Sequence, residues 1–171
     1  MKFIPLSQTY KCKLSTLKLF VKVDDADFES LSKHNWQAWR SRKDSTYYAV
    51  RNVKDENGKR RIVLMHREIM NASKNQMVDH ANRDGLDCQC LNLRFCNHSE
   101  SNINKRSHKD SSSKYIGVSW FRRDGKWKAQ ICLDHKNRHI GYYINEIDAA
   151  KAYNEKAKEL HGEFATINAI P

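Results

Sequence analysis

Hydrophobic and polar residues change their spacing along the chain, and each spacing predicts a different kind of element. Residues 1–65 consist mainly of short stretches in which apolar and polar positions alternate, which is typical of strands. Phe28 and Leu31 lie three positions apart in a polar stretch, and this spacing predicts a short helix among the strands. The pair Asn57-Gly58 separates two alternating stretches and predicts a β-hairpin, because both residues readily adopt the conformation of a tight turn.

Residues 76–105 predict a compact motif of two short strands followed by one helix. Turn-forming residues around Asp84 separate two short apolar stretches, which suits a pair of strands joined by a loop. One short helix is predicted before this motif, from His66 to Ala72. The motif's own helix is predicted from Ser99 to Lys105, with Ser99 as its cap.

The C-terminal third of the chain predicts a sheet and one long helix. Residues 106–114, RSHKDSSSK, contain no apolar side chain and predict a flexible, basic linker. The segments YIGVSWFRR, WKAQICLD and RHIGYYI then predict three strands, and Trp127 and Ala129 share one face of the second strand. The segment EIDAAKAYNEKAKELHG has apolar residues at helical spacing, with Asn145 as the cap and Gly162 as the end.

These patterns predict an α+β protein in four parts. The parts are a β-rich N-terminal region with a hairpin (1–75), a ββα motif (76–105), the linker (106–114) and a three-stranded antiparallel sheet packed on one helix (115–171). One face of that sheet packs against the helix. Its other face stays open and carries the polar side chains.

The charge of the chain points to a polyanionic partner. The 171 residues contain 31 Lys and Arg against 20 Asp and Glu, which gives a net charge of +11 and a pI near 9.5. DNA or RNA is the first candidate, and ten Lys and Arg against three Asp between residues 105 and 143 centre the positive charge on the linker and sheet. A basic protein without such a partner is the alternative. An anionic membrane surface is the competing partner, but it fits poorly because the chain shows no long apolar helix and no clear basic amphipathic helix. No stretch approaches the ~20 apolar residues of a membrane span, so we expect no membrane partner.

The N-terminus and the cysteines bear on where the protein works. MKFIPLSQTY has no apolar core of a signal peptide, which predicts an intracellular, cytoplasmic protein. The five cysteines form no CxxC pair, so a disulfide scaffold is not expected. Cys88, Cys90, Cys96 and His98 have a spacing unlike the usual zinc patterns, and zinc is therefore not expected either.

Asp79-His80, with Asn92 twelve positions after the histidine, is the pattern that most suggests chemistry. Hydrolysis of a phosphodiester needs an activated water and a cation that takes up charge on the phosphate. His80 suits the role of general base at neutral pH. Asp79 suits a hard cation, Mg²⁺ or Mn²⁺, with one ion per site, and the amide of Asn92 can orient the imidazole of His80.

The runs VDHANRDGLD and NLRFCNHSE make residues 66–104 similar to HNH endonucleases of the ββα-metal class. In that family the Asp-His pair supplies a metal ligand and the general base, and the asparagine orients the base. The resemblance implies these roles for Asp79, His80 and Asn92.

The position of the family's second metal ligand departs from the pattern. The family expects an asparagine or a histidine there, whereas this chain has Ser101. Either His98 or Asn102 takes over as the second ligand, or the metal is bound weakly and the site is slow or inactive.

Residues 115–168 resemble an AP2 domain of the type attached to many HNH homing endonucleases of phages and mobile introns, which implies a bacterial or phage-infected cell. The resemblance is carried by Tyr-x-Gly-Val, Gly-Lys-Trp, Ile-Gly-Tyr-Tyr, Ala-Ala-x-Ala-Tyr and the closing Gly-Glu-Phe-Ala-x-x-Asn. It implies that the open sheet face enters the major groove of DNA, with either Phe121 or Arg122 on that face. Gln130 and Asn137 are suited to base edges, and Lys and Arg to phosphates. The candidate DNA contacts are Arg67, Arg94, Lys105, Arg106, Lys109, Lys114, Arg122, Arg123, Lys128, Gln130, Asn137 and His139.

The sequence as a whole predicts a metal-dependent DNA endonuclease of the HNH homing type that nicks or cuts double-stranded DNA. The AP2-like sheet would position the DNA, and a monomer is expected, with a dimer left open. The alternative is a DNA-binding protein or regulator with a degenerate, inactive HNH site, which the serine at position 101 favours. An RNA-binding protein is a third possibility, disfavoured because no aromatic-rich RNA-reading motif is evident.

Overall fold

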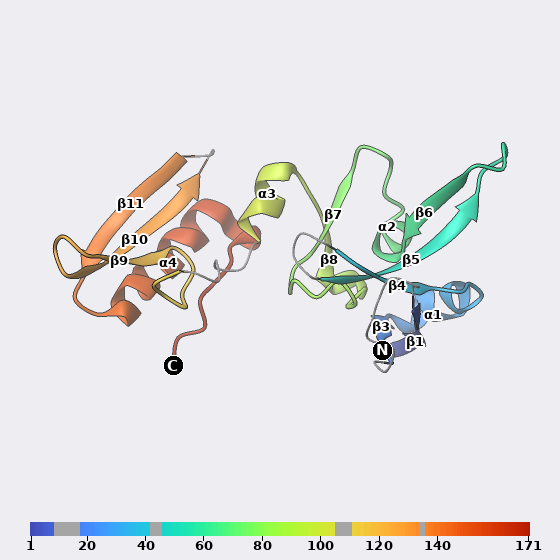
Figure 1. The fold of residues 1–171 in the computed structure, drawn as a ribbon, viewed down its shortest axis with the longest axis horizontal. Coiled ribbons are helices and arrows are strands. Elements are labelled where there is room, and N and C mark those ends of the chain that lie inside the picture. The colour runs from blue at the N-terminus through green and yellow to red at the C-terminus, as the bar shows by residue number, and fades with distance from the viewer. Residues whose placement is uncertain (9–17, 42–45, 105–110, 134–135) are drawn as a thin grey trace. The chain divides into compact units, whose positions relative to one another are not determined.

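The structure is a computed structural model whose described residues are 1–8, 18–41, 46–104, 111–133 and 136–171. It divides into two compact units, Met1–Cys96 and Asn97–Pro171, whose folds Figure 1 shows. Each unit has its own buried hydrophobic cluster. Among the described residues, no helix has the length and apolar character needed to cross a bilayer.

In its described residues, the N-terminal unit consists of short strands and two short helices. Its elements are β1 (Lys2–Pro5), β2 (Ser7–Gln8), β3 (Phe20–Val23), α1 (Asp25–Ser32), β4 (Gln37–Arg40), β5 (Tyr47–Lys54), β6 (Arg60–Leu64), α2 (Met65–Ile69), β7 (Met77–His80), a 3-10 turn (Cys90–Asn92) and β8 (Leu93–Cys96). A four-stranded sheet has the order β2-β4-β5-β6, while β1 pairs with β3 and β7 with β8. The mixed α/β character with antiparallel sheets agrees with the predicted α+β class.

One hydrophobic core holds the N-terminal unit together. Val21 and Val23 alternate toward this core from β3, and the fully buried Trp36 donates from its indole to the carbonyl of Leu31 at 2.8 Å. Cys88, from the loop between β7 and β8, belongs to the same core, and its backbone N–H donates to the carbonyl of Lys22 at 2.9 Å. The predicted boundary between residues 75 and 76 therefore lies inside one unit.

The β5–β6 hairpin forms where Asn57-Gly58 predicted it. The two strands pair in an unbroken antiparallel register from Val50↔Leu64 to Lys54↔Arg60. Gly58 has a φ of 73°, which an L side chain rarely adopts and glycine tolerates.

The C-terminal unit is a three-stranded antiparallel sheet covered on one face by a long helix. Its elements are α3 (His98–Ile103), β9 (Val118–Phe121), β10 (Lys126–Leu133), β11 (Lys136–Tyr143), α4 (Glu146–His161) and a 3-10 turn (Gly162–Phe164). The strand order is β11-β10-β9. Ala149 and Ala150 of α4 pack on Val118 and Ala129 of the sheet, which confirms the predicted sheet-and-helix arrangement.

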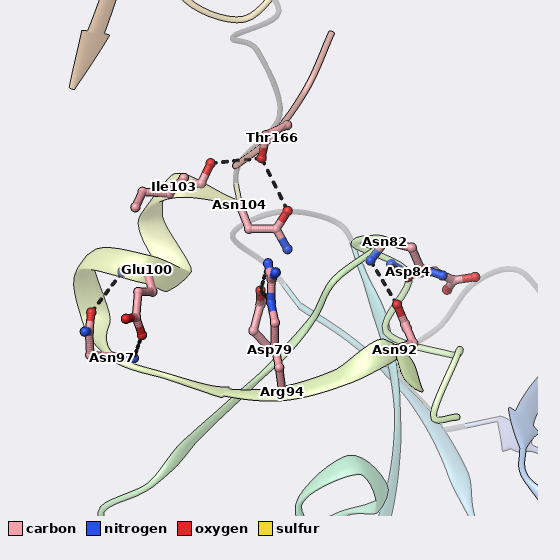
Figure 2. A network of polar contacts seen from close by, with 10 residues as sticks. All are labelled: Asp79, Asn82, Asp84, Asn92, Arg94, Asn97, Glu100, Ile103, Asn104 and Thr166. Atoms are coloured by element: carbon pink, nitrogen blue, oxygen red, sulfur yellow. Dashed lines mark hydrogen bonds and ion pairs between the residues drawn. The ribbon is translucent and has the colours of Figure 1, made fainter. Parts of the chain in front are cut away.

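The ends of α4 lie where the sequence predicts them, whereas the start of α3 does not. Asn145 precedes α4 and Gly162 ends it, as predicted. The α3 helix begins earlier than the predicted Ser99, because the side chain of Asn97 accepts from the backbone N–H of Glu100 while Glu100 accepts from that of Asn97. This reciprocal capping box, visible in Figure 2, follows from the Asn-x-x-Glu spacing of Asn97 and Glu100.

The structure differs from the prediction of a flexible linker at 106–114. The buried hydroxyl of Ser113 donates to Glu146 of α4 at 2.6 Å and accepts from the backbone N–H of Tyr115 at 3.0 Å. Ser112 accepts from the backbone N–H of Trp120 at 2.8 Å. The second half of this segment is thus part of the C-terminal unit, because serine hydroxyls satisfy backbone and carboxylate partners there. Residues 105–110 lie outside the described residues.

Candidate nucleic-acid interface

The β7–β8 hairpin presents Asp79 and His80 on opposite faces. The register is regular, with Asp79 opposite Arg94 and His80 opposite Leu93. Neighbouring side chains on a regular strand point to opposite sides. A shared phosphate site would need a local irregularity at this point, and the register between the two strands has none.

The carboxylate of Asp79 forms an ion pair with Arg94 (Figure 2). One oxygen of Asp79 accepts from Nη2 of Arg94 at 3.0 Å and from Nε at 3.3 Å. Both side chains are largely shielded, at 16% and 19% exposed. The guanidinium therefore neutralises the carboxylate on which the predicted Mg²⁺ or Mn²⁺ would depend, and this donor set does not fit a dication. The metal itself stays a prediction.

The remaining predicted metal ligands lie on a different unit. His98, Ser101 and Asn102 belong to α3, and His98 and Ser101 share one side of that helix at a spacing of three residues. Thr166 of the C-terminal tail donates to the carbonyl of Ile103 at 3.1 Å, so this helix is tied to the C-terminal unit (Figure 2).

His80 lies in a buried cluster of rings. It is 5% exposed and its ring meets that of His66 edge-on, with 4.8 Å between the centroids. Tyr48 packs against both rings, and Nε2 of His80 lies 3.9 Å from Sγ of Cys88. Burial lowers the pKa of His80, while the charge of Asp79 acts in the opposite direction. The imidazole is a neutral core group, which is poorly placed to take a proton from a solvent-borne water.

The amide of Asn92 organises the loop between the two strands. Its Oδ1 accepts from the backbone N–H of Asn82 at 2.9 Å, and its Nδ2 donates to the carbonyl of Asp87 at 2.7 Å. We expected this amide to orient the ring of His80. The structure uses it instead to close the loop that carries Cys88 into the core.

We predict that the Asp79–Arg94 pair stabilises the N-terminal unit. Replacing Arg94 with Met keeps most of the aliphatic stem and leaves a shielded carboxylate without this partner, which should lower the free energy of unfolding by about 1–3 kcal/mol. Urea unfolding measures the effect. Arg61→Met, at an exposed position of β6, is the matched control and should cost under ~0.5 kcal/mol. Equal stability of the two variants would contradict the assignment.

The face of the C-terminal sheet opposite α4 is defined by strand register. Residues directly opposite each other on neighbouring strands share a face. Lys128 lies opposite Ser119 on one side and Tyr142 on the other, and Lys126 lies opposite Phe121. Gln130 and Cys132 follow at alternate positions of β10, and they lie opposite His139 and Asn137. We call this set the open face: Ser119, Phe121, Lys126, Lys128, Gln130, Cys132, Asn137, His139 and Tyr142.

The register settles the choice between Phe121 and Arg122. Phe121 is the last residue of β9 and lies on the open face, whereas Arg122 begins the exposed turn that leads to β10. Lys128, Gln130, Asn137 and His139, all predicted as DNA contacts, come together on this face.

Tyr142 was missed because a β-bulge changes the alternation of β11. Gln130 lies opposite His139, but the preceding residue of β10, Ala129, lies opposite Gly141. Strict alternation from His139 would place Tyr142 on the covered face. The bulge turns it to the open face instead, and no residue in RHIGYYI signals the bulge clearly.

Aromatic rings form a continuous row on the open face. The ring centroids of Phe121 and Tyr142 are 5.1 Å apart, and those of His139 and Tyr142 are 4.5 Å apart. The guanidinium of Arg123 lies over Phe121, 5.2 Å from its centroid, and also pairs with Asp124 at 2.8 Å. Cations and rings are therefore interleaved along this surface.

The other predicted DNA contacts have varied surroundings. Arg67 donates to the backbone carbonyls of Ser73 and Gln76, so its guanidinium holds the loop after α2. Arg94 pairs with Asp79, and Lys114 lies over the ring of Tyr115. Three predicted contacts fall outside the described residues: Lys105, Arg106 and Lys109.

Comparison with known proteins gives AP2-type relatives. No protein-family model matches the chain. The AP2-like ethylene-responsive transcription factor TOE2 of Arabidopsis thaliana is 33% identical over 66 residues, which are 39% of this chain and 14% of the relative. APETALA2-like protein 2 of Oryza sativa, in both the indica and japonica subspecies, is 34% identical over 64 residues, 37% of this chain and 15% of the relative. The chain thus spans only a small part of these relatives.

These relatives correct the prediction of an enzyme. They are AP2-type proteins, one of them named as a transcription factor, and none bears the name of a nuclease. The prediction that the chain is an HNH endonuclease is therefore wrong, and the ion-paired Asp79 and buried His80 give a physical reason for the failure. The AP2 half of the resemblance is confirmed: over 64 to 66 of its residues the chain is similar to AP2-type proteins.

Proposed function

We propose that the chain is a double-stranded DNA-binding protein of the regulator class, in which the HNH-like hairpin is an inactive structural element. The observation that carries the proposal is the open face of the β9–β10–β11 sheet. It gathers Lys126, Lys128, Gln130 and His139 on the side that α4 leaves uncovered. The likeness to AP2-type proteins supports the same partner, because a transcription factor acts on DNA.

The chemistry of this face suits a duplex in two ways. Lys126 and Lys128 supply charge for phosphates, and the exposed Arg122 adds to it from the adjoining turn. The amide of Gln130 can pair with the donor and acceptor of an adenine edge in the major groove. Phosphate contacts fix the position of the protein, while the amide supplies a sequence preference.

The N-terminal unit contributes stability rather than chemistry in this proposal. The Asp79–Arg94 pair joins β7 to β8, and the loop between them sends Cys88 into the core. The carboxylate of Asp79 and the amide of Asn92 thus both have structural partners. The net charge of +11 still attracts the whole chain to DNA.

We predict that removing two lysines from the open face weakens binding to duplex DNA. The double variant Lys126→Gln with Lys128→Gln should lower affinity, and the slope of log K against log salt should become shallower by up to about 2 if both lysines contact phosphate. Fluorescence anisotropy of a labelled, mixed-sequence duplex measures both quantities. The cause is counterion release, which falls by roughly one ion for each phosphate contact that is lost.

The matched control removes the same charge from the helix. Lys151→Gln with Lys158→Gln alters two exposed lysines of α4. The buried residues of this helix pack on the face of the sheet opposite the open face. This control should keep the wild-type salt slope. If the two double variants behave alike, binding comes from overall charge and the open face is not the interface.

A further inference from the structure

The rings of Phe121 and Tyr142 have no assigned role in the duplex contact proposed above. Tyr142 is 42% exposed, His139 is exposed, and Phe121 is half-buried beneath Arg123. Bases in a duplex already stack on one another, so a groove presents their edges and not their faces. Exposed rings therefore find little to stack on in a regular duplex.

Unpaired bases supply the missing partner. Every base has a π-face that stacks on an aromatic side chain, and sheets that bind single strands commonly use two or three such rings. The row His139–Tyr142–Phe121 extends across the sheet from β11 to β9, with neighbouring centroids 4.5 and 5.1 Å apart. Such a spacing allows one or two bases to lie against the rings.

Positive charge flanks the row where a strand's phosphates would lie. Lys128 is directly opposite Tyr142, and Lys126 is directly opposite Phe121. A single strand whose bases stack on the rings can direct its phosphates toward these lysines. A positively charged surface combined with stacking rings is the usual arrangement of a single-strand binding site.

We propose that His139, Tyr142 and Phe121 form a base-stacking platform that binds a short unpaired segment of DNA or RNA. This inference rests on the proposed function, because it uses the face assigned to DNA, and it adds a second ligand of different geometry. Arg123 covers one side of Phe121, whereas Tyr142 is exposed and contacts both other rings, so it is the central ring of the row. Loss of the Tyr142 ring should have the largest effect.

The test compares three nucleic acids on the full chain by fluorescence anisotropy: oligo(dT), oligo(rU) and a mixed-sequence duplex. Tyr142→Leu should weaken binding to the single strands by about tenfold, the usual effect of losing one stacked base, and should weaken duplex binding by clearly less, because a duplex offers this ring no unstacked base. Tyr142→Phe keeps the ring and should keep the affinity. Oligo(dT) and oligo(rU) distinguish DNA from RNA as the source of the unpaired bases.

Two further measurements separate stacking from a general loss of structure. Trp120→Leu removes an exposed ring of β9 that packs beside Trp127, on the face of the sheet opposite the open face. This control variant should bind single strands like wild type. Thymine resonances of bound oligo(dT) should shift upfield in NMR spectra because of ring currents, and this shift should disappear in Tyr142→Leu.

The outcomes distinguish this inference from the proposed function. Duplex binding without single-strand binding would overturn the platform and leave the proposed function intact. Binding to neither would overturn both. Single-strand binding that Tyr142→Leu does not change, or that Trp120→Leu weakens equally, would also overturn the platform.

Discussion

Replacing Gly117 with Ala is expected to unfold the C-terminal unit or to lower its free energy of unfolding by about 3–5 kcal/mol. Gly117 has a φ of 76°, and an added Cβ would meet the ring of Tyr153 and lie 2.6 Å from the backbone oxygen of Gln130. The backbone oxygen cannot move away, because Gln130 sits in the middle strand of the sheet. This close approach explains the glycine in the Tyr-x-Gly-Val run.

Gly125→Ala is the matched control in the same unit. Gly125 also has a positive φ, 59°, but no atom lies within 4 Å of its added Cβ. The control therefore carries only the conformational cost, about 1 kcal/mol. Urea unfolding followed by circular dichroism should separate the two variants clearly. If both variants lose the same stability, the clash with Tyr153 and Gln130 is not real.

Acidification is expected to destabilise the N-terminal unit from pH 6.5 downwards, through the buried histidines. Burial, followed by the charges of His80 and Arg67, lowers the pKa of His66 from 6.5 to about 3. The folded state therefore favours the neutral ring, and the associated stability is present above pH 6.5 and lost as the pH falls toward 3. His66 alone gives a slope of up to about 1.4 kcal/mol per pH unit, and burial lowers the pKa of His80 in the same direction.

Urea unfolding at a series of pH values measures this dependence. His66→Phe removes one titrating ring and should flatten the fall in stability below pH 6.5, whatever it does to stability at neutral pH. His34→Gln, at an exposed position of the same unit, is the control and should keep the wild-type slope. A His66→Phe profile parallel to wild type would show that His66 is not held neutral.

Local patterns predicted the C-terminal fold well. The helix from Glu146 to His161 has the helical apolar spacing and both end signals, and β10 alternates cleanly between Trp127 and Leu133. The Asn57-Gly58 turn likewise specified its hairpin. Such signals are local, so neighbouring residues alone determine the element.

The candidate sites could not be predicted in the same way, because their side chains meet only when strands that are distant in the sequence pair with one another. Asp79 and Arg94 are fifteen residues apart and meet only because β7 pairs with β8. Tyr142 reaches the open face only because of the bulge opposite Ala129 and Gln130. The aromatic row consists of rings from β9 and β11, which are far apart in the sequence. No aromatic motif is therefore visible in the sequence, although the fold brings these rings together.

The failed prediction of an endonuclease has the same origin. Asp79, His80 and Asn92 have the spacing of an HNH pattern, but spacing does not reveal what each side chain contacts. In the structure, the carboxylate of Asp79 forms an ion pair with Arg94, and the imidazole of His80 is buried in the core. The amide of Asn92 donates to the backbone of the loop. A motif carries its chemistry only with its structural context.

The most direct test of the central claim is to map the surface that double-stranded DNA contacts. NMR amide shifts of the full chain, recorded with and without a mixed-sequence duplex, provide this map. The proposed function predicts the largest changes on β9, β10 and β11, centred on Lys128, Gln130 and His139. No change on addition of the duplex, or changes confined to Met1–Cys96, would contradict it.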